Sequence, residues 1–291
     1  MSAPVSAPVG AYDPRVTPIR GGVAARSLEG VVPADRYVDP TPMQVRAPLA
    51  GLRQGPEGGA ELADQLLFGE LFDVLESQDG WAWGQARRDG YVGWTPLEAL
   101  SPEIHTPTHR VAALRTYAFA EPSLKTRLRG LYSLNALVTV EAEDGAYVKL
   151  AGSGWTPSRH LSPIGSVEDD PAAVAMRFLG APYLWGGRDS VGLDCSGLIQ
   201  QALYACGKAC PRDSDQQKAG LGRPFEPGAR LWGLRRTDLV FWRGHVGMML
   251  DGEQLLHANA HHMAVAIEPL AEAVARIEAT AVGAPTGFNR L

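Results

Sequence analysis

Cys195 occupies a position where a cysteine can act as a nucleophile, at the start of an apolar helix that follows a glycine-rich turn. Asp194 is a natural N-cap for this helix, and apolar residues recur at helical spacing from Leu198 to Leu203. A thiol in a first helical turn is close to the positive end of the helix dipole and to unpaired backbone N–H groups, which favour thiolate over thiol. Because a lone cysteine on a helix is more often a small buried apolar residue, this prediction needs a base nearby.

Two histidines later in the chain could supply that base. His245 opens an apolar run typical of a strand, and His257 follows in a second run after a turn around Gly252. Neighbouring strands of a hairpin bring side chains into contact. We therefore expect His245 to act as base toward Cys195, and His257 to bind the far ring nitrogen of His245 and orient it.

These residues resemble the NlpC-type cell-wall cysteine peptidases, a branch of the papain-like superfamily. The matching pieces are Tyr183 to Gly187, Asp194 to Gly197, Gly244 to Gly247, and His257. The resemblance covers roughly residues 170–291. It implies hydrolysis of the bond between the γ-carboxyl of D-glutamate and the following diamino acid, diaminopimelate or lysine, in peptidoglycan stem peptides.

The same resemblance implies roles for side chains around the thiol. The Tyr183 hydroxyl and the Cys195 N–H would stabilise the oxyanion. Asp194 either caps the helix or holds a substrate amine, and the sequence leaves both open. Asp213 likewise either caps a short helix or faces the substrate amine. The implied substrate-binding residues of this cleft are Asp194, Ser196, Arg212, Asp213 and Ser214.

The length of 291 residues predicts two or three domains. Short apolar runs broken by Gly, Asp and Pro indicate small all-β barrels, which resemble bacterial SH3-like domains. Two such stretches share the piece Gly-Trp-Thr-Pro, an internal repeat. The expected fold is multidomain: an N-terminal extended arm (1–42), a first SH3-like barrel (43–103), a second SH3-like barrel (104–163) and an α+β papain-like catalytic domain (164–291).

Two residues of the first barrel are candidates for substrate contact. In relatives with two such barrels, the first leans over the active site, so the resemblance implies that Glu70 holds the free amine of the substrate. Trp94, with Tyr91 as the alternative, would be the nearby aromatic residue. The other interpretation of Glu70 is a solvated surface charge.

Composition limits the partners. A net charge of −5 gives no reason to expect nucleic acid or an anionic membrane surface. The first twenty residues contain no basic cluster followed by an apolar core, so we expect no signal peptide and a cytoplasmic location. The three cysteines all lie between Cys195 and Cys210, which predicts no disulfide framework, no metal and no cofactor. The oligomeric state stays unknown.

We therefore expect a cysteine endopeptidase that acts on recycled muropeptides with a free N-terminal L-Ala. An acyl transferase would use the same thiol if an amine or alcohol outcompeted water, but the barrels resemble cell-wall modules. A cell-wall-binding protein without activity is the other alternative, and the complete set of Cys195, His245 and His257 argues against it.

Overall fold

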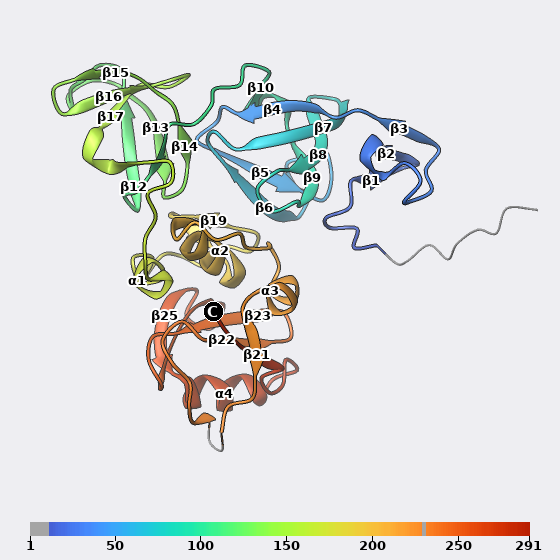
Figure 1. Cartoon of the computed structure of the whole chain (residues 1–291), viewed down its shortest axis with the longest axis vertical. Coiled ribbons are helices and arrows are strands. Elements are labelled where there is room, and N and C mark those ends of the chain that lie inside the picture. Colours follow the sequence, from blue (N-terminus) through green and yellow to red (C-terminus); the bar gives the residue numbers. More distant parts are fainter. Residues whose placement is uncertain (1–11, 229–230) are drawn as a thin grey trace, which may run out of the picture.

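Strands build the first part of the protein and the α-helices follow after residue 163 (Figure 1). The structure is a computed structural model that describes residues 12–228 and 231–291. Among the described residues, no helix is long and apolar enough to cross a membrane. The architecture is thus β followed by α+β, and the predicted fold class is confirmed.

The expected N-terminal arm falls partly on residues 1–11, which lie outside the described residues. From residue 12 onward the arm contains a small sheet rather than only extended chain. Its strands are β1 (Ile19–Arg20), β2 (Val23–Ala25) and β3 (Arg36–Val38), with a 3-10 turn at Arg26–Leu28. Before this sheet the chain lies beside the first barrel, where the Arg15 carbonyl accepts a hydrogen bond from the Val92 N–H at 2.8 Å.

The first barrel is a seven-stranded antiparallel sheet in the order β10-β4-β7-β8-β9-β5-β6. Its strands are β4 (Thr41–Val45), β5 (Leu49–Arg53), β6 (Leu62–Leu67), β7 (Leu71–Gln78), β8 (Trp81–Ala86), β9 (Val92–Pro96) and β10 (Leu100–Ser101). Alternate side chains such as Leu52, Leu66 and Phe72 are fully buried and form the core, because successive strand residues point to opposite faces.

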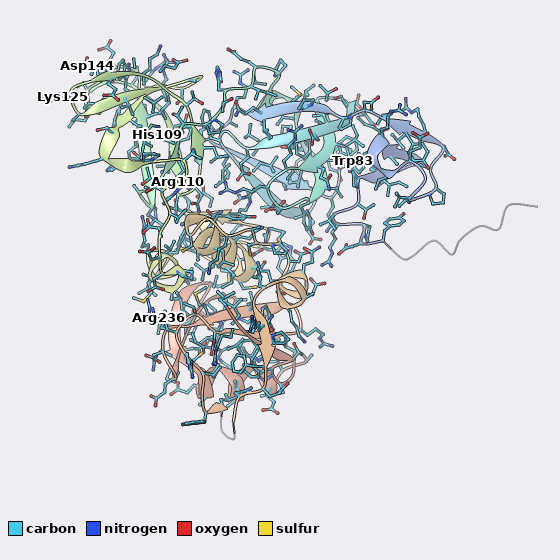
Figure 2. The ribbon with its side chains drawn as sticks, in the orientation of Figure 1. Trp83, His109, Arg110, Lys125, Asp144 and Arg236 are labelled. Carbon is cyan, nitrogen blue, oxygen red and sulfur yellow. The ribbon has the colours of Figure 1, made fainter. Side chains whose placement is uncertain are left out.

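The second barrel combines the sheets β14-β11-β18 and β13-β12-β17-β16-β15. Its strands are β11 (His109–Val111), β12 (Arg115–Phe119), β13 (Leu128–Ser133), β14 (Leu137–Val138), β15 (Val140–Asp144), β16 (Tyr147–Leu150), β17 (Trp155–Pro157) and β18 (Leu161–Pro163). Figure 2 shows Lys125 and Asp144 at its outer end and Arg110 beside the catalytic domain, where Arg110 donates a hydrogen bond to the Ser166 carbonyl at 3.3 Å.

The catalytic domain is a six-stranded antiparallel sheet, β21-β26-β22-β23-β24-β25, between helices. The strands of this sheet are β21 (Arg223–Phe225), β22 (Leu239–Trp242), β23 (His245–Met249), β24 (Gln254–Asn259), β25 (Ala264–Pro269) and β26 (Gly287–Arg290). A separate two-stranded sheet pairs β19 (Arg188–Asp189) with β20 (Gly192–Leu193). The helices of the domain are α1 (Pro171–Met176), α2 (Cys195–Ala205), α3 (Ser214–Gly220) and α4 (Leu270–Glu278).

Side chains of this sheet alternate between two cores. Val246 and Met248 of β23 join the core around α2, whereas Met249 joins the core around α4. Figure 1 shows α2 on the side of the barrels and α4 on the far side. One face of the sheet therefore packs against α2 on the side of the barrels, and the other face packs against α4 on the far side.

Candidate active site

Cys195 is the first residue of α2, as the sequence predicts. The Asp194 carboxylate caps the helix by accepting a hydrogen bond from the Gly197 N–H at 2.8 Å. Its second oxygen accepts from the Gly186 N–H at 2.9 Å. Because Cys195 begins the helix, its own N–H has no intrahelical acceptor and is available to an oxyanion.

The Cys195 thiol is neutral in the resting protein. Burial raises its pKa to about 12, and the charge of Asp194 acts in the same direction. The N–H of Val246 and the Arg212 guanidinium lower the pKa but do not outweigh burial. The helix start therefore does not by itself give the resting thiolate that we expected. Within the described residues no hydrogen bond joins this thiol to His245, and catalytic hydrogen bonds often tighten only when substrate binds.

His245 and His257 lie on neighbouring strands and their rings touch. His245 Nε2 is 2.8 Å from His257 Nδ1, the contact expected from the sequence. Burial lowers the pKa of both histidines to about 3. Both rings are therefore neutral near pH 7, which leaves His245 able to accept a proton.

Gly247 of the Gly-His-Val-Gly motif lies close to side chains of the neighbouring strand β24. A Cβ at this position would lie 2.7 Å from Leu255 Cδ1 and 3.2 Å from His257 Cβ. Both contacts are closer than side chains normally allow. A side chain at this position would therefore crowd Leu255 and His257 on the neighbouring strand.

Gly186 makes the corresponding contact between the catalytic domain and the first barrel. Its φ is +73°, and a Cβ there would lie 2.3 Å from the Leu62 carbonyl oxygen. Only glycine combines this backbone conformation with so close an approach. The Trp-Gly-Gly turn before Cys195 therefore packs directly against β6.

A buried network of charges joins the same two domains. Arg188 and Arg212 of the catalytic domain are 0% and 1% exposed. Asp64 of β6 accepts from Arg212 Nε at 2.7 Å and lies 3.1 Å from Arg188 Nε. Arg212 also binds Asp194, at 2.6 and 3.0 Å. The barrel thus holds, through Arg212, the residue that caps the nucleophile helix.

Glu70 belongs to this network and not to the substrate pocket, which corrects the sequence-based role. It is 2% exposed, and its carboxylate lies 2.5 Å from Arg188 and 2.8 Å from Arg88. Burial raises the pKa of Glu70, but Arg188 and Arg88 outweigh it and hold the pKa below its usual value. Neither the predicted amine contact nor the alternative of a solvated charge fits this position.

Trp94 also differs from expectation. It is 1% exposed and is covered by the Arg20 guanidinium, 4.6 Å from the ring centre. Tyr91, the alternative aromatic residue, lines the pocket instead. Trp94 on β9 is covered by the arm through Arg20, whereas Tyr91 precedes that strand and its hydroxyl reaches Asp213.

A cavity of about 270 Å³ opens beside Cys195, small for ligand pockets, which typically measure about 300–1,000 Å³. Its walls come from three parts of the chain: the arm, the first barrel and the catalytic domain. The lining residues are Arg15; Gln54, Glu61, Ala63 and Tyr91; and Tyr183, Trp185, Gly186, Asp194, Cys195, Ser196, Asp213, Ser214, Asp215 and Gly244. Four of these are acidic and one is basic, and arginines pair with Asp194, Asp213 and Asp215. Among the described residues, Glu61 is the lining acid without an arginine partner.

Besides Asp215, two charged pocket residues were not predicted from the sequence. Glu61 of the first barrel accepts a hydrogen bond from the Trp185 indole at 2.9 Å. Arg15 of the arm lies 2.8 Å from both Asp213 and Asp215. Both come from segments without a motif, and only the fold brings them to the catalytic domain.

Asp213 shares its outer oxygen between two groups. It accepts from Arg15 at 2.8 Å and from the Tyr91 hydroxyl at 3.1 Å, and it also forms the capping box of α3 with Gln216. Ser214 lines the cavity at the start of the same helix. The two possibilities for Asp213 are therefore compatible, since one residue both caps the helix and faces the pocket.

The remaining predicted residues divide between pocket wall and support. Tyr183 and Ser196 line the cavity, and burial raises the pKa of Tyr183, which keeps its hydroxyl a hydrogen-bond donor. Arg212 does not line the cavity. It donates to the Ser196 hydroxyl at 2.8 Å and to Asp194, so it positions the two rather than reaching a ligand.

One set of side chains has the composition of a metal site. Ligand atoms of His257, His262 and Glu268 lie within 4.8 Å of one another. However, both ring nitrogens of His257 are in hydrogen-bonded contacts, and Glu268 pairs with Arg276. These atoms already have partners, so we assign no metal role to them.

An antiparallel sheet that bears two touching histidines, packed on a helix that begins with a cysteine, defines a cysteine peptidase of the papain-like type. Comparison with known proteins gives the family. Residues 180–283 match the model of the NlpC/P60 family, and residues 52–100 match the bacterial dipeptidyl-peptidase Sh3 domain. The chain belongs to the NlpC/P60 family.

Several relatives match over most of their length. The chain is 33% identical over 244 residues to the gamma-D-glutamyl-L-lysine dipeptidyl-peptidase of Bacillus subtilis, covering 75% of this chain and 79% of the relative. It is 27% identical to the protein of the same name from Bacillus cereus, covering 72% and 71%. A crystal structure of an NlpC/P60 family protein from Bacillus cereus superimposes with a TM-score of 0.69 at 19% identity, covering 86% and 99%. That structure supports the fold.

Proposed function

We propose that this peptidase cleaves the bond between D-glutamate, linked through its γ-carboxyl, and the following diamino acid in peptidoglycan-derived peptides, and that it prefers peptides with a free N-terminal L-Ala. The names of the relatives from Bacillus subtilis and Bacillus cereus support the bond. The acidic cavity beside Cys195 supports the free amine.

The reaction follows from the positions of the side chains. His245 takes the proton of the Cys195 thiol as its sulfur attacks the amide carbonyl, and the Cys195 N–H and the Tyr183 hydroxyl bind the oxyanion. His245 then gives the proton to the leaving amine of the diamino acid. Water hydrolyses the thioester and releases the dipeptide.

The carboxylates that face the cavity are the main support for amine recognition. Glu61 is held in place by the Trp185 indole. Burial raises the pKa of Asp213 although Arg212 and Arg15 oppose this shift, so a bound ammonium would offset part of the cost of burying that charge. Acylation of the amine removes this ion pair.

Such selectivity suits soluble recycled peptides rather than polymeric wall, because a stem peptide joined to muramic acid has no free N-terminal amine. We therefore keep the proposal of a cytoplasmic enzyme of muropeptide recycling. The barrel wall of the pocket also supports this substrate, since it limits the cavity beside Cys195 to a small volume.

The test compares L-Ala-γ-D-Glu-L-Lys with the same peptide acetylated at the N-terminus, and repeats the pair with diaminopimelate in place of lysine. Loss of the ion pair at a cost of about 2–5 kcal/mol corresponds to a preference of about 30- to 4,000-fold in kcat/KM for the free amine. Mass spectrometry of the released dipeptide measures both rates. Equal rates on free and acetylated peptides would reject amine recognition.

Glu61→Gln should narrow this preference by slowing only the free-amine peptide. Glu57→Gln is the matched control, because Glu57 is an exposed residue nearby in the same barrel that does not line the cavity. If Glu61→Gln keeps the wild-type preference for the free-amine peptide, Glu61 does not bind the amine. Asp213→Asn then tests Asp213 as the amine-binding residue.

A further inference from the structure

We propose that Glu268 is a positioning residue that fixes the ring tautomers of His257 and His245, and so determines which nitrogen of His245 can accept the proton of Cys195. This inference rests on the cysteine peptidase chemistry described above. Glu268 does not line the pocket and does not belong to the sequence motifs. Its Oε1 lies 2.7 Å from His257 Nε2.

Three adjacent strands place the groups in a row. In the sheet β23, β24 and β25 are neighbours. His257 pairs with Ala266, and Glu268 pairs with Leu255, so Glu268 and His257 are diagonal neighbours on one face of the sheet. His245 continues the row from β23, with its Nε2 at 2.8 Å from His257 Nδ1. His257 and Glu268 are buried, at 0% and 9% exposed, whereas His245 at the end of the row is half-buried.

The proton positions follow from what each atom can do. A carboxylate accepts hydrogen bonds and cannot donate, so the His257 nitrogen that faces Glu268 carries the proton. A neutral imidazole carries one proton, which leaves His257 Nδ1 as an acceptor. His245 must then donate from Nε2, and its Nδ1 stays unprotonated. That atom is free to take the Cys195 proton.

Arg276 strengthens this assignment from the end of the row. The Arg276 guanidinium of α4 forms an ion pair with Glu268, and a carboxylate in such a pair presents only lone pairs to His257. The other titratable side chains near His257 include His261 and His262 on the turn before β25. Neither is hydrogen-bonded to His257, so Glu268 is the acceptor that fixes its tautomer.

The row also matters during the reaction. When His245 takes the thiol proton it becomes a cation, and the negative charge of Glu268 reaches that cation through His257. No proton needs to leave the row for this stabilisation. Removing Glu268 should therefore lower kcat and leave KM unchanged, because Glu268 is outside the cavity that binds substrate.

Two variants separate the acceptor from the charge. Glu268→Met removes both, and we expect kcat to fall about 10- to 100-fold, the loss expected for one charge-assisted hydrogen bond. Glu268→Gln keeps an oxygen acceptor for His257 and should retain the tautomers and more of the rate. Glu272→Gln is the control, an exposed glutamate of the same helix α4 that carries Arg276. A Glu268→Met enzyme with the kcat of the control would overturn the proposal.

Nitrogen-15 NMR of the histidine rings tests the tautomers without any substrate, with the resonances assigned from His245→Gln and His257→Gln. The wild-type protein should show the proton on Nε2 in both His245 and His257. Glu268→Met should show a mixture, and Glu268→Gln the wild-type pattern. A proton on Nδ1 of His245 in the wild type would refute the inference even if Glu268→Met did not fold. Because this measurement needs no turnover, its outcome is independent of whether the proposed substrate is correct.

Discussion

A single residue, Cys195, shows how local and non-local effects compete. Its place at the start of α2 favours ionisation, yet burial raises the pKa to about 12. His245, with a pKa lowered to about 3, does not form an imidazolium partner at neutral pH. The resting pair is therefore neutral thiol and neutral imidazole, and proton transfer belongs to the reaction with substrate.

This charge state predicts how the thiol reacts with iodoacetamide. Because only the thiolate reacts, the rate at Cys195 should keep rising about tenfold per pH unit from pH 6 to 10. Peptide mapping by mass spectrometry separates Cys195 from Cys206 and Cys210. The controls are Cys206→Ala and Cys210→Ala, which should leave turnover intact, whereas Cys195→Ala abolishes it. A rate that levels off below pH 8 would instead indicate a thiolate–imidazolium pair.

The buried histidines predict the dependence of stability on pH. His257 has a pKa of about 3 when folded, against about 6.5 when unfolded. Its contribution is complete above about pH 6.5 and is lost as the pH falls toward 3, because the unfolded chain then binds the proton more strongly. The slope is at most about 1.4 kcal/mol per pH unit for one group. Urea unfolding of wild type and His257→Gln between pH 7 and 4 should show a shallower dependence in the variant, and equal slopes would contradict a buried neutral His257.

The residues that could be predicted from sequence are those whose role is indicated by the residue types next to them in the chain. Cys195 follows its cap, and His245 precedes the glycine that its strand needs, so short segments contain the signal. Glu61 and Glu268 have no such neighbours. Glu268 could have been suspected only from the alternation of residues 264–269, which puts it on the same face as Ala266, and the partner strand was needed to show His257 there.

At the level of elements, β6 is the strand that connects the first barrel to the catalytic domain. Asp64 of this strand accepts a hydrogen bond from Arg212, and the Leu62 carbonyl packs closely against Gly186. The strand itself is evident from its apolar pattern, and so is the barrel. Its charge pairing was not predicted, because each partner lies more than a hundred residues away and an isolated acid in a strand looks like a surface residue. Glu70, which follows β6, was assigned to the substrate from the family resemblance, and its pairing with Arg88 and Arg188 was not predicted.

Glu70→Gln should therefore affect stability rather than substrate preference. The substitution removes one of the carboxylates that pair with the fully buried Arg188 guanidinium. We therefore expect the free energy of unfolding to fall by about 3–5 kcal/mol. Asp73→Asn, which breaks the more exposed pair with Arg87 in the same barrel, should cost less than about 1 kcal/mol. Thermal and urea unfolding measure both. A Glu70→Gln protein as stable as Asp73→Asn, but with a reduced preference for the free amine, would restore the original assignment.

For the whole molecule, the pocket is determined by how the domains pack together rather than by how many domains there are. The number and type of domains follow from composition and turn patterns, whereas the pocket depends on how the arm, first barrel and catalytic domain meet. Arg15, Tyr91 and Asp213 touch although they belong to three different segments. Such contacts between distant segments depend on packing that no local pattern encodes.

The distance along the chain between the pocket walls has a consequence for biosynthesis. Arg15 and Asp213 are 198 residues apart, and at about 5–20 residues per second a ribosome needs roughly 10–40 s to pass from one to the other. During that interval the arm and first barrel can already be folded outside the ribosome, while the nucleophile and its histidines do not yet exist or are still in the exit tunnel. The part of the pocket that the arm and first barrel supply is thus synthesised before the part that contains the catalytic residues. A nascent chain therefore cannot hydrolyse a peptide until its catalytic domain has folded and packed against the first barrel.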